Sequence, residues 1–222
     1  MMSHQTIRVM KTPRSVDLNL TNNCNLRCAY CSHFESAGDV DGDLPTEEWL
    51  EFFEELKDCA VMDVTLSGGE VFIRPDITEL IEGVVRNRMR YSILSNGTLI
   101  TDKIARFLVS TGRCKSVQVS IDGPGPEAHE VFRGKGTFDK ALRGLRCLMD
   151  AGISATVRVT VHKYNVDVLP DIARLLLEEV GLPSFSTNAA SLMGLCVENS
   201  DKVQLSVEEY SRAMAELVRL KK

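Results

Sequence analysis

The 222-residue sequence has no apolar run near the length of a membrane span and no block of like charges. Its N-terminus, MMSHQTIRVMKTPRS, lacks the apolar core of a secretory signal peptide. The net charge is −5, and the sequence has no run of basic residues of the kind that binds nucleic acid. These absences predict a cytoplasmic globular protein that binds neither a membrane nor nucleic acid.

The sequence has seven cysteines, too few for a disulfide scaffold in a chain of this length, and the count is odd. Three of the cysteines form a group, Cys24, Cys28 and Cys31, spaced C-x3-C-x2-C with Tyr30 just before the last. Three thiolates on one short loop can hold three corners of a cubic four-iron cluster and leave the fourth iron open. The spacing alone leaves two alternatives, a zinc loop completed by His33 or a distant residue, and three free cysteines. Four cysteines stand alone in apolar contexts that predict small core residues: Cys59, Cys114, Cys147 and Cys196.

Short β-rich runs alternate with amphipathic stretches along the chain. We expect strands at residues 15–20, 63–67, 91–95, 116–121, 154–161 and 184–188, and helices at 46–60, 75–88, 101–112, 137–152, 168–180 and from 206 onward. Thr46 is the expected cap of the first helix, and Ser206 with Glu209 forms a capping box for the last.

The six β-α units predict an α/β fold. The strands read as mostly apolar on both faces, which is typical of a parallel sheet. Six units are too few to close an eight-stranded barrel, so we expect a partial (β/α)6 TIM-like barrel, with a doubly wound open sheet as the second possibility. In both folds ligands bind at the carboxyl ends of the strands.

Polar and glycine residues follow the predicted strands. They are Gly68-Gly69-Glu70 after the second strand, Asn96 after the third, Ser120 and Asp122 after the fourth, and Arg133 on a glycine-rich loop. Each alone could be a tight turn or a surface side chain, and His162 near the end of the fifth strand reads as an ordinary rim or partly buried histidine. Together, glycines that let a ligand approach, a carboxylate for an ammonium group and an arginine for a carboxylate suit an amino-acid-like ligand beside a metal cluster.

At these positions the sequence resembles the radical S-adenosylmethionine (radical SAM) superfamily, from about Val16 to the last helix. The cysteine loop with Tyr30 is similar to the superfamily's cluster loop, and Gly68-Gly69-Glu70 is similar to its methionine-binding motif. The resemblance implies a [4Fe-4S] cluster on Cys24, Cys28 and Cys31, with S-adenosylmethionine on the open iron. An electron, from a donor such as flavodoxin or ferredoxin, would split the cofactor into methionine and a 5′-deoxyadenosyl radical that abstracts hydrogen from a substrate. An apolar barrel interior would shield that radical.

The resemblance also implies roles for single residues. It places Tyr30 near the adenine, Gly68, Gly69 and Glu70 on the methionine amine, Ser120 and Arg133 on the methionine carboxylate, Asn96 and Asp122 near the ribose or the substrate, and Leu192 as a further cofactor contact. Two departures stand out. Val71 follows the GGE motif where the superfamily often has proline, and the fifth strand lacks a glycine-rich pattern, which leaves most adenine contacts unassigned.

Three segments are similar to members that carry a SPASM or twitch extension and modify peptides or proteins: residues 129–139, 95–97 and 120–124. This implies an N-terminal segment (1–14) and a core domain (15–222), with the extension absent from this chain. It also implies a peptide or protein substrate, as in the maturation of ribosomally made peptides or of sulfatases. The alternatives are a small-molecule metabolite or cofactor precursor as substrate, a zinc-stabilised α/β binding module, and a degenerate radical SAM fold that serves as a partner-binding scaffold.

Overall fold

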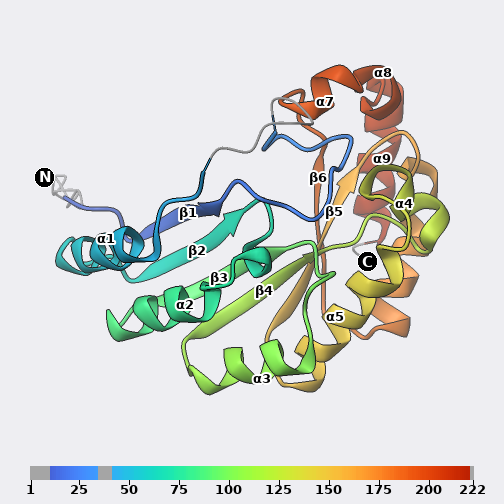
Figure 1. Ribbon diagram of the computed structural model, residues 1–222. Coiled ribbons are helices and arrows are strands. Elements are labelled where there is room, and N and C mark those ends of the chain that lie inside the picture. Colours follow the sequence, from blue (N-terminus) through green and yellow to red (C-terminus); the bar gives the residue numbers. More distant parts are fainter. Residues whose placement is uncertain (1–10, 35–41, 221–222) are drawn as a thin grey trace, which may run out of the picture.

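The computed structural model describes residues 11–34 and 42–220, and its centre is one six-stranded parallel sheet (Figure 1). The strands are β1 (Ser15–Thr21), β2 (Asp63–Gly68), β3 (Arg90–Ser95), β4 (Cys114–Ser120), β5 (Ala155–Val161) and β6 (Ser186–Ala189). They lie in the order β1-β2-β3-β4-β5-β6, and every neighbouring pair is parallel. A doubly wound sheet reverses direction at a switch point, whereas this chain always advances the same way. The predicted open partial barrel is therefore confirmed.

Helices follow the strands as the sequence pattern predicts. The predicted helices are α1 (Thr46–Asp58), α2 (Ile77–Arg86), α3 (Asp102–Ser110), α5 (Phe138–Asp150), α6 (Leu169–Ala173) with its π-helical continuation η3 (Arg174–Glu179), and α9 (Val207–Leu220). Figure 1 shows α1, α2, α3 and α5 along the outer side of the sheet. Within residues 11–34 and 42–220, no helix has the length and apolar character needed to cross a membrane.

The structure adds short elements that the sequence analysis did not predict. They are α4 (Pro126–Arg133), α7 (Leu195–Glu198), α8 (Ser200–Val203) and the 3₁₀ helices η1 (Val71–Ile73) and η2 (Val166–Val168). Arg133 therefore ends a helix instead of lying on a glycine-rich loop. Pro126 occupies the first turn of α4, and Gly134, with a φ of 99°, follows its last residue. Glycines on both sides made this eight-residue helix look like one long loop.

Two helix starts show how caps decide boundaries. The expected cap by Thr46 is wrong, because Pro45 precedes the helix and the Thr46 hydroxyl donates instead to Asp76 Oδ2 at 2.6 Å. The predicted capping box of α9 is confirmed. Ser206 N donates to Glu209 Oε2 at 2.7 Å, and Glu209 N donates to Ser206 Oγ at 3.2 Å.

The strands have one apolar face and one polar face, which corrects the expectation of strands apolar on both sides. In β5, Val157 and Val159 are buried, while Arg158 between them is exposed. The same alternation runs through the other long strands, because successive side chains of a strand point to opposite faces. Buried residues of the apolar face pack with the helices in one core. We call the opposite, polar face the inner face; it replaces the apolar barrel interior that was expected.

The isolated cysteines are only partly core residues. Cys196 is buried, and Cys114 and Cys147 are partly exposed. Cys59, directly after α1, is exposed, contrary to the prediction. Its position at the end of an outer helix explains this, because only one face of α1 reaches the core.

Candidate functional site

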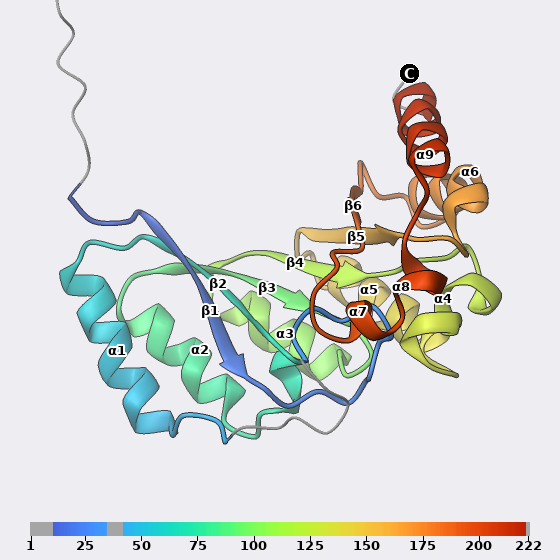
Figure 2. The same ribbon diagram turned by 90° about the horizontal axis from the view of Figure 1, so that it is seen from above.

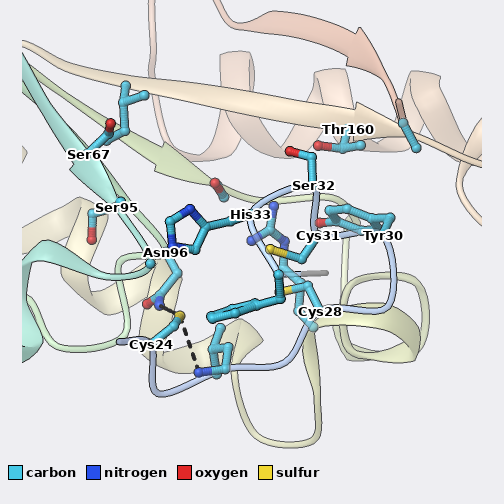
Figure 3. Close-up of a pocket in the computed structure, with 18 of the residues that line it drawn as sticks. Cys24, Cys28, Tyr30, Cys31, Ser32, His33, Ser67, Ser95, Asn96 and Thr160 are labelled. Carbon is cyan, nitrogen blue, oxygen red and sulfur yellow. Dashed lines mark hydrogen bonds between the residues drawn. The ribbon is translucent and has the colours of Figure 1, made fainter. Parts of the chain in front are cut away.

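A pocket of about 270 Å³ lies at the carboxyl ends of the strands. Residues from the ends of five strands line it: Gly68 of β2, Ser95 of β3, Ser120 of β4, Thr160 of β5 and Asn188 of β6. The three cysteines of the loop after β1 also line it, and Figure 3 shows their side chains directed into this pocket. The fold thus brings the cysteine loop and the strand ends to one place.

Two glycines let the end of β2 lie against the entry to the cysteine loop. Gly69 N donates to Thr21 O at 2.8 Å, and Glu70 N donates to Asn23 O at 2.9 Å. A Cβ on Gly69 would stand 2.1 Å from Asn23 O and 3.1 Å from Cys24 Cβ. The sequence suggested close approach to a ligand. The structure shows close approach to the protein's own backbone, and both Gly68 and Gly69 still line the pocket.

The thiols form a donor set that fits an iron–sulfur cluster. All three are partly exposed, and Cys24 Sγ accepts weak hydrogen bonds from Leu26 N at 3.4 Å and from Asn96 Nδ2 at 3.9 Å. Burial raises the pKa of Cys24, and it raises the pKa of Cys28 to about 11 against the opposing effect of Arg133. The thiols of Cys24 and Cys28 are therefore protonated at neutral pH, and metal binding must displace their protons.

His33 lies in the same pocket. Its Nε2 atom is buried without a hydrogen-bond partner, and its ring packs edge-on against Phe34 with ring centroids 5.0 Å apart. In the part of the chain that the structure describes, no three His, Cys, Asp or Glu side chains are placed to hold a single metal ion. Iron, sulfide and zinc content distinguish a zinc site from a cluster site at these cysteines.

Glu70 lies beneath the pocket and does not line it. The residue is fully buried, and its carboxylate accepts hydrogen bonds from Asn96 N at 2.7 Å, Ser95 Oγ at 2.9 Å and Phe72 N at 3.3 Å. Burial raises the pKa of this carboxyl, and the three hydrogen bonds oppose that shift. Glu70 therefore ties the end of β2 to the end of β3. Asn96, which it holds, lines the pocket.

Asp122 lies behind the pocket, although the sequence placed it near a ribose or substrate. The carboxylate is fully buried, and its Oδ2 accepts hydrogen bonds from Arg133 Nε at 2.5 Å and from the Tyr30 hydroxyl. Thr160 N donates to its Oδ1 at 2.8 Å. Burial alone would raise the pKa of Asp122, but Arg133 and these hydrogen bonds lower it. Arg133 and Tyr30 both reach the pocket lining.

The other predicted contacts divide between the pocket and its surroundings. Ser120 lines the pocket, whereas Leu192 is about half exposed, at 48%, and lies outside the lining. The ring of Tyr30 is buried against Phe132 and His162, with ring centroids 6.0 and 5.8 Å apart. His162 is completely buried, more so than expected for a rim histidine.

Sequence reasoning missed several lining residues, above all Thr160, Asn188 and Ser191. The alternation of polar and apolar residues in β5 places Arg158 and Thr160 on the inner face, so the pattern could have identified Thr160. Asn188 pairs with Thr160 across the β5–β6 ladder and follows from the same pattern.

The segment after β6 packs against the cysteine loop. Leu195 N donates to Phe34 O at 2.9 Å, and Asn199 Nδ2 donates to Ala29 O at 3.2 Å. Figure 2 shows α7 beside the blue segment that contains the loop. The side chains beneath the loop form a second apolar cluster: Tyr30, Phe132, Cys196 and Val203. No local sequence pattern indicates these contacts, because they join segments far apart in the chain.

Known proteins are similar to this chain in sequence and in fold. The chain is 30% identical over 177 residues to the antilisterial bacteriocin subtilosin biosynthesis protein AlbA of Bacillus subtilis, covering 79% of this chain and 39% of AlbA. It is 39% identical over 164 residues to the Fe-coproporphyrin III synthase of Methanosarcina barkeri, covering 72% of this chain and 40% of that protein. The chain thus spans less than half the length of these relatives.

A similar solved structure is that of SuiB from Streptococcus suis bound to S-adenosylmethionine. Its TM-score is 0.75 at 18% identity, and the match covers 95% of this chain and 46% of SuiB. This likeness supports the open barrel fold. The family model described as the Radical SAM superfamily matches residues 18–176, more than two thirds of the chain. The chain therefore belongs to the radical SAM superfamily.

Proposed function

We propose that this chain is the core of a radical SAM enzyme in which Cys24, Cys28 and Cys31 hold a [4Fe-4S] cluster. Membership of the family implies an iron–sulfur cluster and S-adenosylmethionine. When bound and reduced by a donor such as flavodoxin or ferredoxin, the cluster would supply the electron that splits S-adenosylmethionine into methionine and a 5′-deoxyadenosyl radical, which would remove hydrogen from the substrate. The observation that carries the proposal is that three thiols of one loop and the polar ends of five strands line a single pocket.

The residues around the pocket suit the amino-acid end of the cofactor. Backbone groups of Gly68 and Gly69 would accept from its ammonium, with the negative charge of Glu70 beneath them. The Ser120 hydroxyl and the Arg133 guanidinium would donate to its carboxylate. Tyr30 and Asn96 would lie along the adenosine. Leu192 would contact the cofactor only if the segment after β6 moved toward the pocket.

Metal content and cofactor cleavage test this function together. Protein reconstituted without oxygen should contain about four irons and four sulfides per chain. With dithionite, or with reduced flavodoxin or ferredoxin, it should convert S-adenosylmethionine into methionine and 5′-deoxyadenosine. Cys28→Ala should lose both properties. Cys59→Ala is the matched control, because Cys59 is exposed and lies outside the pocket.

Two results would contradict the proposal. A protein with a full complement of iron and sulfide that releases no 5′-deoxyadenosine would not be a radical SAM enzyme. A single tightly bound zinc without sulfide would favour the structural zinc module, because a structural zinc ion is held by protein ligands alone.

For the substrate we propose a peptide or protein. AlbA is a biosynthesis protein for the bacteriocin subtilosin, and one SuiB structure is bound to its precursor peptide SuiA. The inner face adds physical support, because it presents hydroxyl and amide groups such as Thr65, Gln118 and Thr156. Such groups can pair with the N–H and C=O groups of an extended main chain.

A small-molecule cofactor precursor is the second candidate, favoured by the 39% identity to the Fe-coproporphyrin III synthase. The two classes can be separated by asking which compound increases 5′-deoxyadenosine formation. A porphyrin-type precursor of iron coproporphyrin III is one probe, because the synthase is named for its product, and a short precursor peptide encoded beside this gene is the other. Stimulation by the porphyrin but not by the peptide would overturn the peptide proposal.

A further inference from the structure

The carboxylate of Asp122 joins three separate parts of the fold at one point. It accepts from Tyr30 in the cysteine loop, from Arg133 at the end of α4 and from the backbone of Thr160 in β5. We propose that Asp122 is a positioning residue, which orients the Arg133 guanidinium toward the carboxylate of S-adenosylmethionine. This inference rests on the proposed function, in which Arg133 receives that carboxylate.

The ion pair fixes one edge of the guanidinium and leaves the other edge available. Arg133 Nε is committed to Asp122 Oδ2 at 2.5 Å, and across residues 11–34 and 42–220 no second carboxylate forms an ion pair with Arg133. The guanidinium carbon lies 5.4 Å from the centroid of the Tyr30 ring. Because a guanidinium is planar, a bond at Nε and a ring beside it together determine where its two Nη groups point. Arg133 is part of the pocket lining, so these groups are the donors left for an anionic ligand.

Asp122 itself has little freedom to move. Its backbone N–H donates to His129 Nδ1 at 3.1 Å, and its backbone C=O accepts from Asn165 Nδ2 at 2.8 Å. Asn165 is buried and also accepts from His162 N at 2.8 Å. Every polar group of Asp122 is therefore held by a neighbour, and the orientation that it imposes on Arg133 is fixed before a ligand arrives.

Asp122 could affect a ligand carboxylate in two opposite ways. If it only neutralised Arg133, removing its charge would make the arginine attract an anion more strongly. If it orients Arg133, removing it would loosen the paired donor geometry that a carboxylate needs and would weaken binding. The Nε contact and the buried, fully bonded carboxylate favour the second effect.

The test is Asp122→Asn, which keeps the shape of the side chain and removes its charge. Protein reconstituted with iron and sulfide is studied by equilibrium dialysis against S-adenosylmethionine and against decarboxylated S-adenosylmethionine, which lacks only the carboxylate. We expect the dissociation constant for S-adenosylmethionine to rise by about 10- to 100-fold, the usual effect of losing a charged hydrogen bond or a supporting partner. The constant for the decarboxylated ligand should change little, and iron content should stay at the wild-type value.

Two further variants sharpen the result. Arg133→Gln should produce the same selective loss, and the double variant should lose no more than either single one. Asp63→Asn is the matched control, because Asp63 pairs with Arg90 at 2.9 Å at the opposite end of β2 and should leave both constants unchanged. If Asp122→Asn does not fold, Arg133→Lys is studied in its place, because lysine keeps the positive charge but lacks the paired N–H donors of the guanidinium. Retained preference for the carboxylate in Arg133→Lys would overturn the inference.

Two other results for Asp122→Asn would overturn the positioning role. An equal loss for both ligands would mean that Asp122 only supports the loop, and tighter binding of S-adenosylmethionine would mean that it only neutralises Arg133. Each overturns positioning. Wild-type protein that binds neither ligand would instead overturn the proposed function, so the two failures are distinguishable.

Discussion

The contact between Gly69 and the cysteine loop gives the sharpest prediction about assembly of the site. In Gly69→Ala, the new Cβ would stand 2.1 Å from Asn23 O and 2.6 Å from Asn23 C. Both are backbone atoms, and the next residue is Cys24. Relief of the overlap requires a separation of about 3 Å or more, so the loop entry must move by about 1 Å and take Cys24 with it.

The magnitude follows from overpacking and a lost hydrogen bond. Overpacking of a close-packed site costs about 1–3 kcal/mol. The bond from Glu70 N to Asn23 O, now 2.9 Å, would lengthen and cost about a further 1 kcal/mol. We therefore expect the free energy of unfolding to fall by about 2–4 kcal/mol. The iron bound per chain after reconstitution should fall as well, because Cys24 leaves its place beside Cys28 and Cys31.

The assay combines urea unfolding of the metal-free protein with iron and sulfide analysis after anaerobic reconstitution. Gly42→Ala is the control, because a Cβ at Gly42 meets no atom within 4 Å. A Gly69→Ala protein with wild-type stability and wild-type iron content would refute the reasoning that this glycine sets the position of the loop.

Two further predictions concern the buried polar groups. In Glu70→Gln the amide keeps one acceptor oxygen for three donors. We therefore expect lower thermal stability and weaker S-adenosylmethionine binding, but an unchanged iron content. Loss of the cluster in this variant would contradict the position of Glu70 beneath Asn96. Burial lowers the pKa of His129 and of His162 to about 4, below the value of about 6.5 in an unfolded chain. The unfolded chain then binds more protons between these values, so stability is complete above about pH 6.5 and falls as the pH approaches 4, by on the order of 3 kcal/mol per histidine. Urea midpoints measured from pH 7 to pH 4.5 should show this loss, and His162→Phe should flatten it; an identical slope in that variant would contradict a neutral, buried His162.

The fold and the meeting of the motifs could be predicted from the sequence, because both rest on local signals. Six strands separated by helices have few parallel arrangements, and the carboxyl ends of parallel strands meet at one edge. The cysteine loop and Gly68-Gly69 each follow a strand directly, so a correct strand placement was enough to bring them together.

The polarity of the inner face was also present in the sequence but was misread. The run Val157-Arg158-Val159-Thr160 alternates with a period of two, the pattern of a half-buried strand. Counting apolar residues without their order made the strand look apolar on both faces. The alternation, taken alone, would have predicted the open polar face and the exposure of Arg158.

The roles of the two buried carboxylates could not be predicted from local sequence. Tyr30 and Asp122 are 92 positions apart, and Glu70 is 25 and 26 positions from its partners Ser95 and Asn96. Whether a strand-end carboxylate faces a ligand or turns inward depends on which distant donors are within reach. Here those donors are protein groups, so both carboxylates shape the pocket from behind.

The most direct experiment asks whether S-adenosylmethionine binds the iron that the three cysteines would leave open. Reduced, reconstituted protein is examined by electron paramagnetic resonance before and after addition of S-adenosylmethionine carrying a nitrogen-15 label in its amino group. We predict a changed cluster spectrum and a hyperfine coupling from the labelled nitrogen, both lost in Cys28→Ala. A cluster spectrum that is identical with and without the labelled cofactor would contradict this prediction.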